Sequence, residues 1–120
     1  MYSERLLDHF QNPRNVGELP PPAITLEVSN PACGDILRLS VRIEGSRVAE
    51  ARYKVRGCTA SIAAGSAMTE MLHGVTRPEA AALTAQAIEG AVGGLAPESK
   101  HAAVLCMDGL KALLRRWDAL

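Results

Sequence analysis

The chain has 120 residues, an ordinary globular composition and a balanced charge. Apolar residues make up 48% of it, and thirteen basic side chains are matched by thirteen acidic ones, so the formal net charge is zero. This length is typical of one domain with a core of its own. A chain without excess positive charge gives no support to a nucleic-acid partner or to an electrostatic membrane anchor. We therefore expect a single domain over residues 1–120.

The sequence also argues against membrane insertion and secretion. No stretch approaches the about 20 consecutive apolar residues of a membrane helix, and the opening MYSERLLDHF lacks the charged and apolar regions of a secretion signal. The three cysteines, at positions 33, 58 and 106, are too few and too widely spaced for a disulfide framework. We expect a cytoplasmic protein whose thiols serve metal or sulfur chemistry, or simply pack in the core.

The first expected element is a short helix in SERLLDHFQNP. Ser3 can cap its N-terminus, and the Asn-Pro pair at the end of the segment should stop it. The apolar residues expected to share one face of this helix are Leu6, Leu7 and Phe10. The proline-rich segment GELPPPA then forms a crossover connection.

Three strands should follow. Apolar and polar residues alternate in stretches that begin near Ile24, Leu37 and Ala51, and a period of two is typical of strands with one buried face. The segment IEGSRV between the second and third stretches contains the Gly-Ser of a hairpin turn. The second and third strands should therefore be antiparallel neighbours.

The sequence after Gly57 has the pattern of helices. An alanine-rich segment runs from Cys58 to His73, Thr76 and Glu79 have the spacing of a capping box, and apolar residues recur at helical spacing from about Ser99 to Trp117. Strands followed by helices indicate an α+β fold. We expect a small three-stranded antiparallel sheet with helices packed on one face.

The expected hairpin brings two thiols to one edge of the sheet. Cys33 precedes the second strand and Cys58 follows the third, at the start of a helix, where the helix dipole favours the thiolate that binds metal. Asp35 can add an oxygen ligand. His101, at the start of the last helix, can add a nitrogen ligand if that end of the helix reaches the same edge. Such a set suits zinc, or forms an incomplete shell for an iron–sulfur cluster.

The spacing of the candidate ligands is weak evidence for a metal site, because no two of them form a CxxC or HExxH pair. Each candidate therefore also has a structural interpretation. The cysteines could be turn or core residues, the carboxylate could cap the turn NPACGD, and the histidine could be an ordinary polar residue at a helix start. These alternatives are open for Cys33, Asp35, Cys58 and His101. Gly57 is expected to serve backbone geometry, because glycine tolerates a positive φ and a close approach where a strand turns into a helix. His9 and His73 belong to no motif and are expected at the surface.

Four segments, in order along nearly the whole chain, resemble the IscU/NifU-type iron–sulfur cluster assembly scaffold family. They are NPRNVG (12–17), NPACGD (30–35), RYKVRGCTASIAAGSAMTEMLHG (52–74) and HAAVLCMDGLKALL (101–114). The resemblance implies a SufE/NifU-like α+β fold with its ligands at one exposed end. It also implies transient assembly of an iron–sulfur cluster, with sulfur from a cysteine desulfurase and transfer to apo iron–sulfur proteins, and zinc binding at the same site.

By this resemblance Cys33, Asp35 and Cys58 fall on ligand positions of the family. His101 falls on the histidine that precedes the family's third ligand cysteine, but here Ala102 follows it. The family's third cysteine is therefore absent from this chain.

Cys106 lies one helical turn beyond Ala102. The rise of a turn, about 5.4 Å, exceeds any tolerance in a metal–sulfur bond of about 2.3 Å. Cys106 also belongs to the apolar stripe of its helix. We therefore expect it to pack in the core rather than replace the missing ligand.

Two functions remain open at this point. The first is a scaffold or carrier, not an enzyme, that binds a cluster, iron or zinc transiently, and this is our expectation. The second is a degenerate relative that binds zinc and regulates, or accepts sulfur from, a cysteine desulfurase. The segment LAPES (95–99) only partly resembles the family stretch recognised by a dedicated Hsp70-type chaperone, which makes that partner doubtful.

Overall fold

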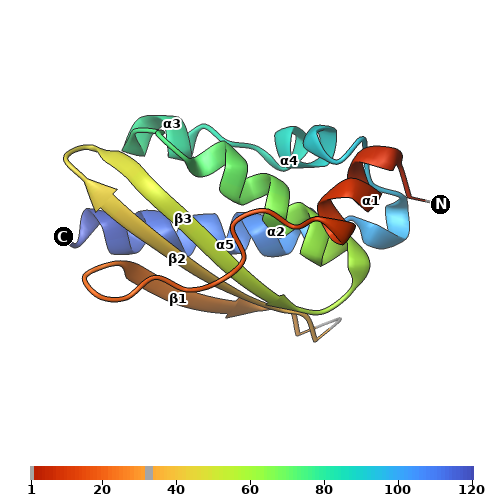
Figure 1. The fold of residues 1–120 in the computed structure, drawn as a ribbon, viewed down its shortest axis with the longest axis horizontal. Coiled ribbons are helices and arrows are strands. Elements are labelled where there is room, and N and C mark those ends of the chain that lie inside the picture. The colour runs from red at the N-terminus through yellow and green to blue at the C-terminus, as the bar shows by residue number, and fades with distance from the viewer. Residues whose placement is uncertain (1, 32–33) are drawn as a thin grey trace.

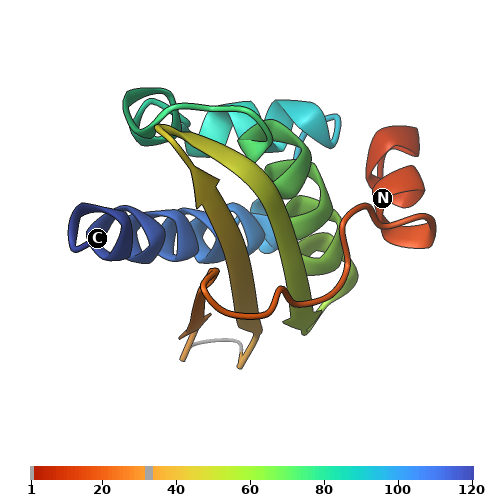
Figure 2. The same ribbon diagram turned by 60° about the vertical axis from the view of Figure 1, so that its left-hand side comes forward.

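The computed structural model describes residues 2–31 and 34–120 and has the α+β fold that the sequence predicts. Strands β1 (Ile24–Ser29), β2 (Ile36–Glu44) and β3 (Arg47–Arg56) form an antiparallel sheet in the order β1-β2-β3. Helices pack on one face of this sheet, and the two ends of the chain lie at opposite ends of the molecule (Figure 1, Figure 2).

The helices form a layer on one face of the sheet (Figure 2). Helix α5 runs behind the sheet, α2 lies between the sheet and the shorter helices, and α1 packs against α2 (Figure 1). Their bounds are α1 (Glu4–Gln11), α2 (Thr59–Leu72), α3 (Arg77–Ala81), α4 (Ala85–Ala91), the 3₁₀ turn η1 (Pro97–Ser99) and α5 (His101–Asp118). None of the helices in the described part of the chain is long and apolar enough to cross a membrane.

The strand register places the candidate site. Ile36, the first residue of β2, pairs with Arg56, the last residue of β3. The hairpin prediction is thereby confirmed, and the segment entering β2 meets the segment leaving β3 at one edge of the sheet. Helix α2 begins three residues beyond Arg56, so its N-terminus lies at this same edge.

Two glycines let the helices approach the sheet closely. A Cβ atom at Gly65 in α2 would lie 2.6 Å from the ring of Tyr53, and one at Gly109 in α5 would lie 2.7 Å from Cδ2 of Leu37. Tyr53 and Leu37 are buried, and Tyr53 donates a hydrogen bond from its hydroxyl to the Ile62 carbonyl. The core therefore fixes both α2 and α5 against the sheet.

Helix α1 departs from the prediction in the face that it buries. Ser3 caps it as predicted, accepting a hydrogen bond from the Leu6 N–H. However, Leu7 and Phe10 are each 37% exposed, and His9 is only 8% exposed. The prediction of a surface position for His9 is wrong, because His9 lies three residues after the buried Leu6 and so shares its inward face.

The C-terminal half largely follows the prediction. Thr76 and Glu79 form the expected capping box at the start of α3. His73 is exposed as expected, although its Nε2 accepts a hydrogen bond from the Ala51 N–H. Helix α5 begins at His101 rather than near Ser99, because residues 97–99 form a 3₁₀ turn instead.

Candidate metal centre

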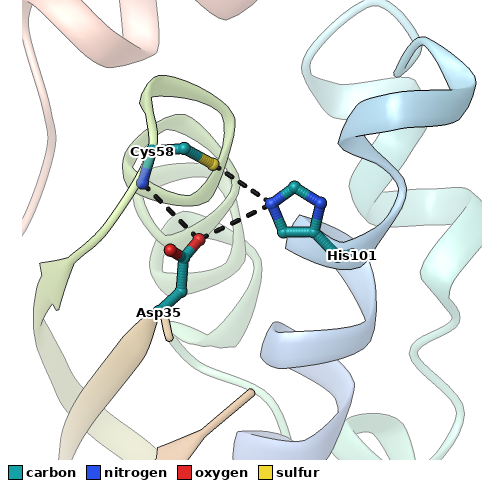
Figure 3. Close-up of side chains that lie close together, drawn as sticks. All are labelled: Asp35, Cys58 and His101. Carbon is teal, nitrogen blue, oxygen red and sulfur yellow. Dashed lines mark hydrogen bonds and ion pairs between the residues drawn. The ribbon is translucent and has the colours of Figure 1, made fainter. Parts of the chain in front are cut away.

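Three of the predicted ligands come together at the edge of the sheet. Asp35 precedes β2, Cys58 is the N-cap of α2, and His101 is the first residue of α5 (Figure 3). Cys58 Sγ lies 3.3 Å from His101 Nε2, which lies 3.6 Å from Asp35 Oδ2. One donor atom from each residue lies within 4.8 Å of the other two. The fourth predicted ligand, Cys33, lies outside the described residues.

The carboxylate of Asp35 replaces the missing cap of helix α2. Cys58 has the extended backbone of an N-cap residue, but its side chain makes no capping hydrogen bond. Instead Oδ2 of Asp35 accepts hydrogen bonds from the Cys58 N–H at 3.5 Å and from the Ser61 hydroxyl at 2.5 Å. A negative carboxylate at a helix N-terminus is also favoured by the helix dipole.

Gly57 makes room for this carboxylate. A Cβ at Gly57 would lie 2.5 Å from Cγ of Asp35, which is closer than real Cβ contacts. Gly57 is not among the glycines with positive φ. The expected close approach is therefore confirmed, whereas the expected positive φ is wrong.

Hydrogen bonds keep Asp35 ionised although it is only 5% exposed. Burial acts to raise the pKa of its carboxyl, but the hydrogen bonds from Ser61 and Cys58, together with the nearby His101, outweigh burial and lower the pKa below its usual value. Asp35 can therefore offer an anionic oxygen to a metal ion at neutral pH.

The ring of His101 is oriented for ligation through Nε2. Its Nδ1 lies 3.1 Å from the carbonyl oxygen of Glu98. A carbonyl oxygen only accepts, so Nδ1 carries the proton of the neutral ring and Nε2 has a free lone pair facing Cys58 and Asp35. A backbone carbonyl on the other ring nitrogen is the usual support of a metal-binding histidine.

Cys106 does not belong to this cluster. It is 1% exposed, and burial raises the pKa of its thiol to about 12. Ala102, which the sequence resemblance places at the family's third cysteine, has no exposed surface. The expectation that Cys106 packs in the core is confirmed, and Cys58 is the one thiol in this cluster among residues 2–31 and 34–120.

The donor set fits a metal ion by chemistry and by spacing. Zinc takes sulfur, nitrogen and oxygen ligands at about 2.0 to 2.3 Å in a tetrahedral arrangement, which puts pairs of ligand atoms roughly 3.3 to 3.8 Å apart. The Cys58–His101 and His101–Asp35 distances of 3.3 and 3.6 Å lie in this range. Two of the three ligand pairs therefore have the spacing of a tetrahedral site, while the donor atoms of Cys58 and Asp35 are held only within 4.8 Å of each other.

Sequence reasoning missed Ser61, which contacts both Asp35 and Cys58. Its Oγ lies 3.3 Å from Cys58 Sγ as well as 2.5 Å from the carboxylate. The available signal was its position three residues after the N-cap, which places a side chain beside the cap residue.

Comparison with known proteins identifies the family. Residues 1–119 match the family described as NifU-like N terminal domain. The chain belongs to this family. This confirms the resemblance found in the sequence, and the match extends over the segments that carry Asp35, Cys58 and His101.

Two curated scaffold proteins align with this chain over most of their length. The iron-sulfur cluster assembly scaffold protein IscU 1 of Archaeoglobus fulgidus is 39% identical over 111 residues, covering 92% of this chain and 72% of the relative. The protein named iron-sulfur cluster assembly scaffold protein IscU from Azotobacter vinelandii is 38% identical over 118 residues, covering 95% and 91%.

Solved structures share the fold. The crystal structure of a NifU-like protein (N-terminal) from Brucella abortus superposes with a TM-score of 0.64 over 86% of this chain and 72% of that chain, at 23% identity. At this identity the likeness concerns the fold alone, and it agrees with the α+β architecture described above.

Proposed function

We propose that this protein is an iron–sulfur cluster assembly scaffold, which holds iron or a cluster transiently and passes it to apo iron–sulfur proteins. The observation that carries the proposal is the convergence of Asp35, Cys58 and His101 within 4.8 Å. It occurs in a family member whose relatives in Archaeoglobus fulgidus and Azotobacter vinelandii are named scaffold proteins. From its position in NPACGD, Cys33 is proposed as a further ligand.

The three side chains suit cargo that must be released again. Cys58 supplies a soft sulfur ligand that retains iron, whereas Asp35 supplies a harder oxygen ligand that is more readily displaced. Cys58 and His101 are partly exposed, while Asp35 is buried. An incoming ligand from an acceptor protein can therefore approach from the side of Cys58 and His101, with Asp35 behind them.

The proposed role also defines the kinds of partner. A cysteine desulfurase would supply the sulfur, and apo iron–sulfur proteins would receive the product. The protein would act as a carrier rather than as an enzyme, since its side chains bind and release cargo. We place this activity in the cytoplasm, where a reducing environment keeps Cys58 available as a thiol.

A second candidate function is zinc binding coupled to regulation of, or sulfur acceptance from, a cysteine desulfurase. The observation that favours it is the single thiol of the cluster in the described ranges, given Ala102 and the buried Cys106. A mixed sulfur, nitrogen and oxygen set is more typical of zinc than of a cluster bound by four thiolates.

Metal and acid-labile sulfide analysis separates the two functions. The protein is purified without oxygen, then reconstituted with ferrous iron and sulfide, and the visible charge-transfer absorption is recorded. The scaffold proposal predicts stoichiometric iron and sulfide, and transfer of the absorption to an apo-ferredoxin. Binding of one zinc ion without any such absorption would instead support the second function.

A further inference from the structure

The hydroxyl of Ser61 contacts two of the three candidate ligands. Ser61 is the third residue of α2 and has no exposed surface. Its Oγ lies 2.5 Å from Asp35 Oδ2 and 3.3 Å from Cys58 Sγ. A hydroxyl has one proton to donate, and the short contact assigns that proton to the carboxylate. This buried hydroxyl is therefore committed to a ligand side chain.

The oxygen that Ser61 binds is also the oxygen that faces the metal position. Asp35 Oδ2 lies 3.6 Å from His101 Nε2 and accepts the Cys58 N–H at 3.5 Å. A metal ion among the three donor atoms must compete with the N-terminus of α2 for this oxygen. Hydrogen bonds to a charged acceptor are stronger than neutral ones, so the competition is substantial.

We propose that Ser61 is a positioning residue that stabilises Asp35 in its metal-free position on the α2 N-terminus and thereby speeds the release of bound metal. The inference rests on the proposed function, because it requires metal at this site. Removing the hydroxyl takes a hydrogen bond from the metal-free carboxylate. The metal-bound carboxylate loses less stabilisation, because the metal ion already competes with Ser61 for the same oxygen. The bound state is then favoured, and Asp35 leaves the metal more slowly.

The test measures zinc release from the full-length protein. Zinc-loaded protein is mixed with an excess of a chromogenic chelator, and the release rate is followed by stopped-flow absorption. Ser61→Ala should slow release about tenfold, the order expected for loss of one hydrogen bond to a charged group. Ser61→Thr keeps the hydroxyl and should release zinc at close to the unmodified rate.

Ser66→Ala is the matched control. Ser66 is equally buried in the same helix, but its hydroxyl bonds to His9 and to the Arg14 N–H instead of the site. Ser66→Ala therefore removes a buried hydroxyl from α2 without changing the surroundings of Asp35. The rate at which this variant releases zinc should equal that of the unmodified protein. Alanine is a better helix former than serine, so Ser61→Ala should fold. A variant that does not fold would show that Ser61 mainly holds α2 in place, which would overturn the proposal.

Coupling to Asp35 separates positioning from simple helix capping. In an Asp35→Ala background, Ser61→Ala should have no further effect on the release rate, because the hydroxyl then has no carboxylate to bind. If Ser61 had only a structural role, Ser61→Ala would lower the urea midpoint of unfolding. It would then change the release rate by the same factor in the unmodified and the Asp35→Ala backgrounds. That second pattern would overturn the proposal.

The remaining outcomes are equally decisive. If the unmodified protein binds zinc and Ser61→Ala releases it at an equal or faster rate, the role of Ser61 is refuted while the proposed function stands. If the unmodified protein binds neither zinc nor a cluster, the proposed function fails and the role of Ser61 fails with it.

Discussion

The carboxylate of Asp35 fills the space that a side chain at Gly57 would occupy. A Cβ there would lie 2.5 Å from Cγ and 2.6 Å from Oδ1 of Asp35. Because Gly57, just after β3, has no side chain, the carboxylate of Asp35, just before β2, can reach the N-terminus of α2. The geometry of the candidate site depends on a residue that itself offers no ligand.

Gly57→Ala should disturb the site without unfolding the protein. Its backbone has no positive φ, so the strain comes from the clash with Asp35, which must move away from Ser61. We expect a loss of about 1 to 3 kcal/mol in the free energy of unfolding, measured in urea, and weaker zinc binding in a chelator competition.

Gly90→Ala is the control for this substitution. Gly90 lies in α4, and a Cβ there meets nothing within 4 Å. Alanine in a helix is favoured over glycine by up to about 1 kcal/mol, so this variant should be as stable as the unmodified protein or more stable. Equal zinc affinity in the Gly57 and Gly90 variants would contradict the role of Gly57.

Only one of the two described cysteines should matter for zinc binding. Cys58→Ala removes the sulfur ligand. Loss of a residue that only supports a ligand lowers metal affinity about 10- to 100-fold, and loss of the ligand itself should lower zinc affinity further. Cys106→Ala should bind the same amount of zinc and lose only about 1 kcal/mol of stability, because Cys106 packs in the core. Isothermal titration of both variants measures this. Loss of zinc in the Cys106 variant alone would show that the site uses a different thiol.

Thiol reactivity should separate the same two residues. Cys58 is partly exposed, whereas Cys106 is buried and its pKa is raised to about 12. Alkylation requires an accessible thiolate. Brief iodoacetamide treatment of metal-free native protein should therefore label Cys58 at least about a hundredfold faster than Cys106, as mass spectrometry can quantify. Similar labelling of both would rule out the packing of α5 described here.

The sequence predicted those parts of the site that follow from strand pairing. Alternating apolar residues and one hairpin turn placed the start of β2 beside the end of β3, which brings Asp35 next to Cys58. His101 was a candidate from its place at the start of the last helix, and the family resemblance supported it. The position of Ser61 three residues after the N-cap could have placed it beside Cys58. Its hydrogen bond to a carboxylate 26 positions away could not be predicted, because such contacts leave no periodic pattern.

Helix α1 shows a second limit of sequence reasoning. A helix of eight residues has so few positions that its buried face is hard to identify from the sequence. A face with Leu6, Leu7 and Phe10 is more hydrophobic than one with Leu6 and His9, so the sequence favoured the wrong face. The buried partner of His9 is Ser66, 57 positions away. A polar contact between distant segments outweighed the local hydrophobic pattern.

The burial of His9 leads to the last prediction, which concerns pH. His9 Nδ1 lies 2.7 Å from Ser66 Oγ, and its Nε2 lies 3.6 Å from Glu70 Oε1. Burial lowers the pKa of His9 below its ordinary value of 6.5, and Arg14 lowers it further, while Glu70 and Asp8 act to raise it. The folded protein therefore favours the neutral ring.

This shift fixes the sign of the pH effect on stability. Because the folded pKa lies below the unfolded one, the unfolded chain binds more protons around and below pH 6.5, and stability falls as the pH drops through that value. Between pH 7.5 and 5.5, metal-free protein should lose stability by less than about 1.4 kcal/mol per pH unit, the slope for one whole proton. His9→Gln should reduce this loss, because it removes the group that takes up the proton. Urea unfolding at several pH values provides the measurement, and an unchanged slope in His9→Gln would show that other groups cause the effect.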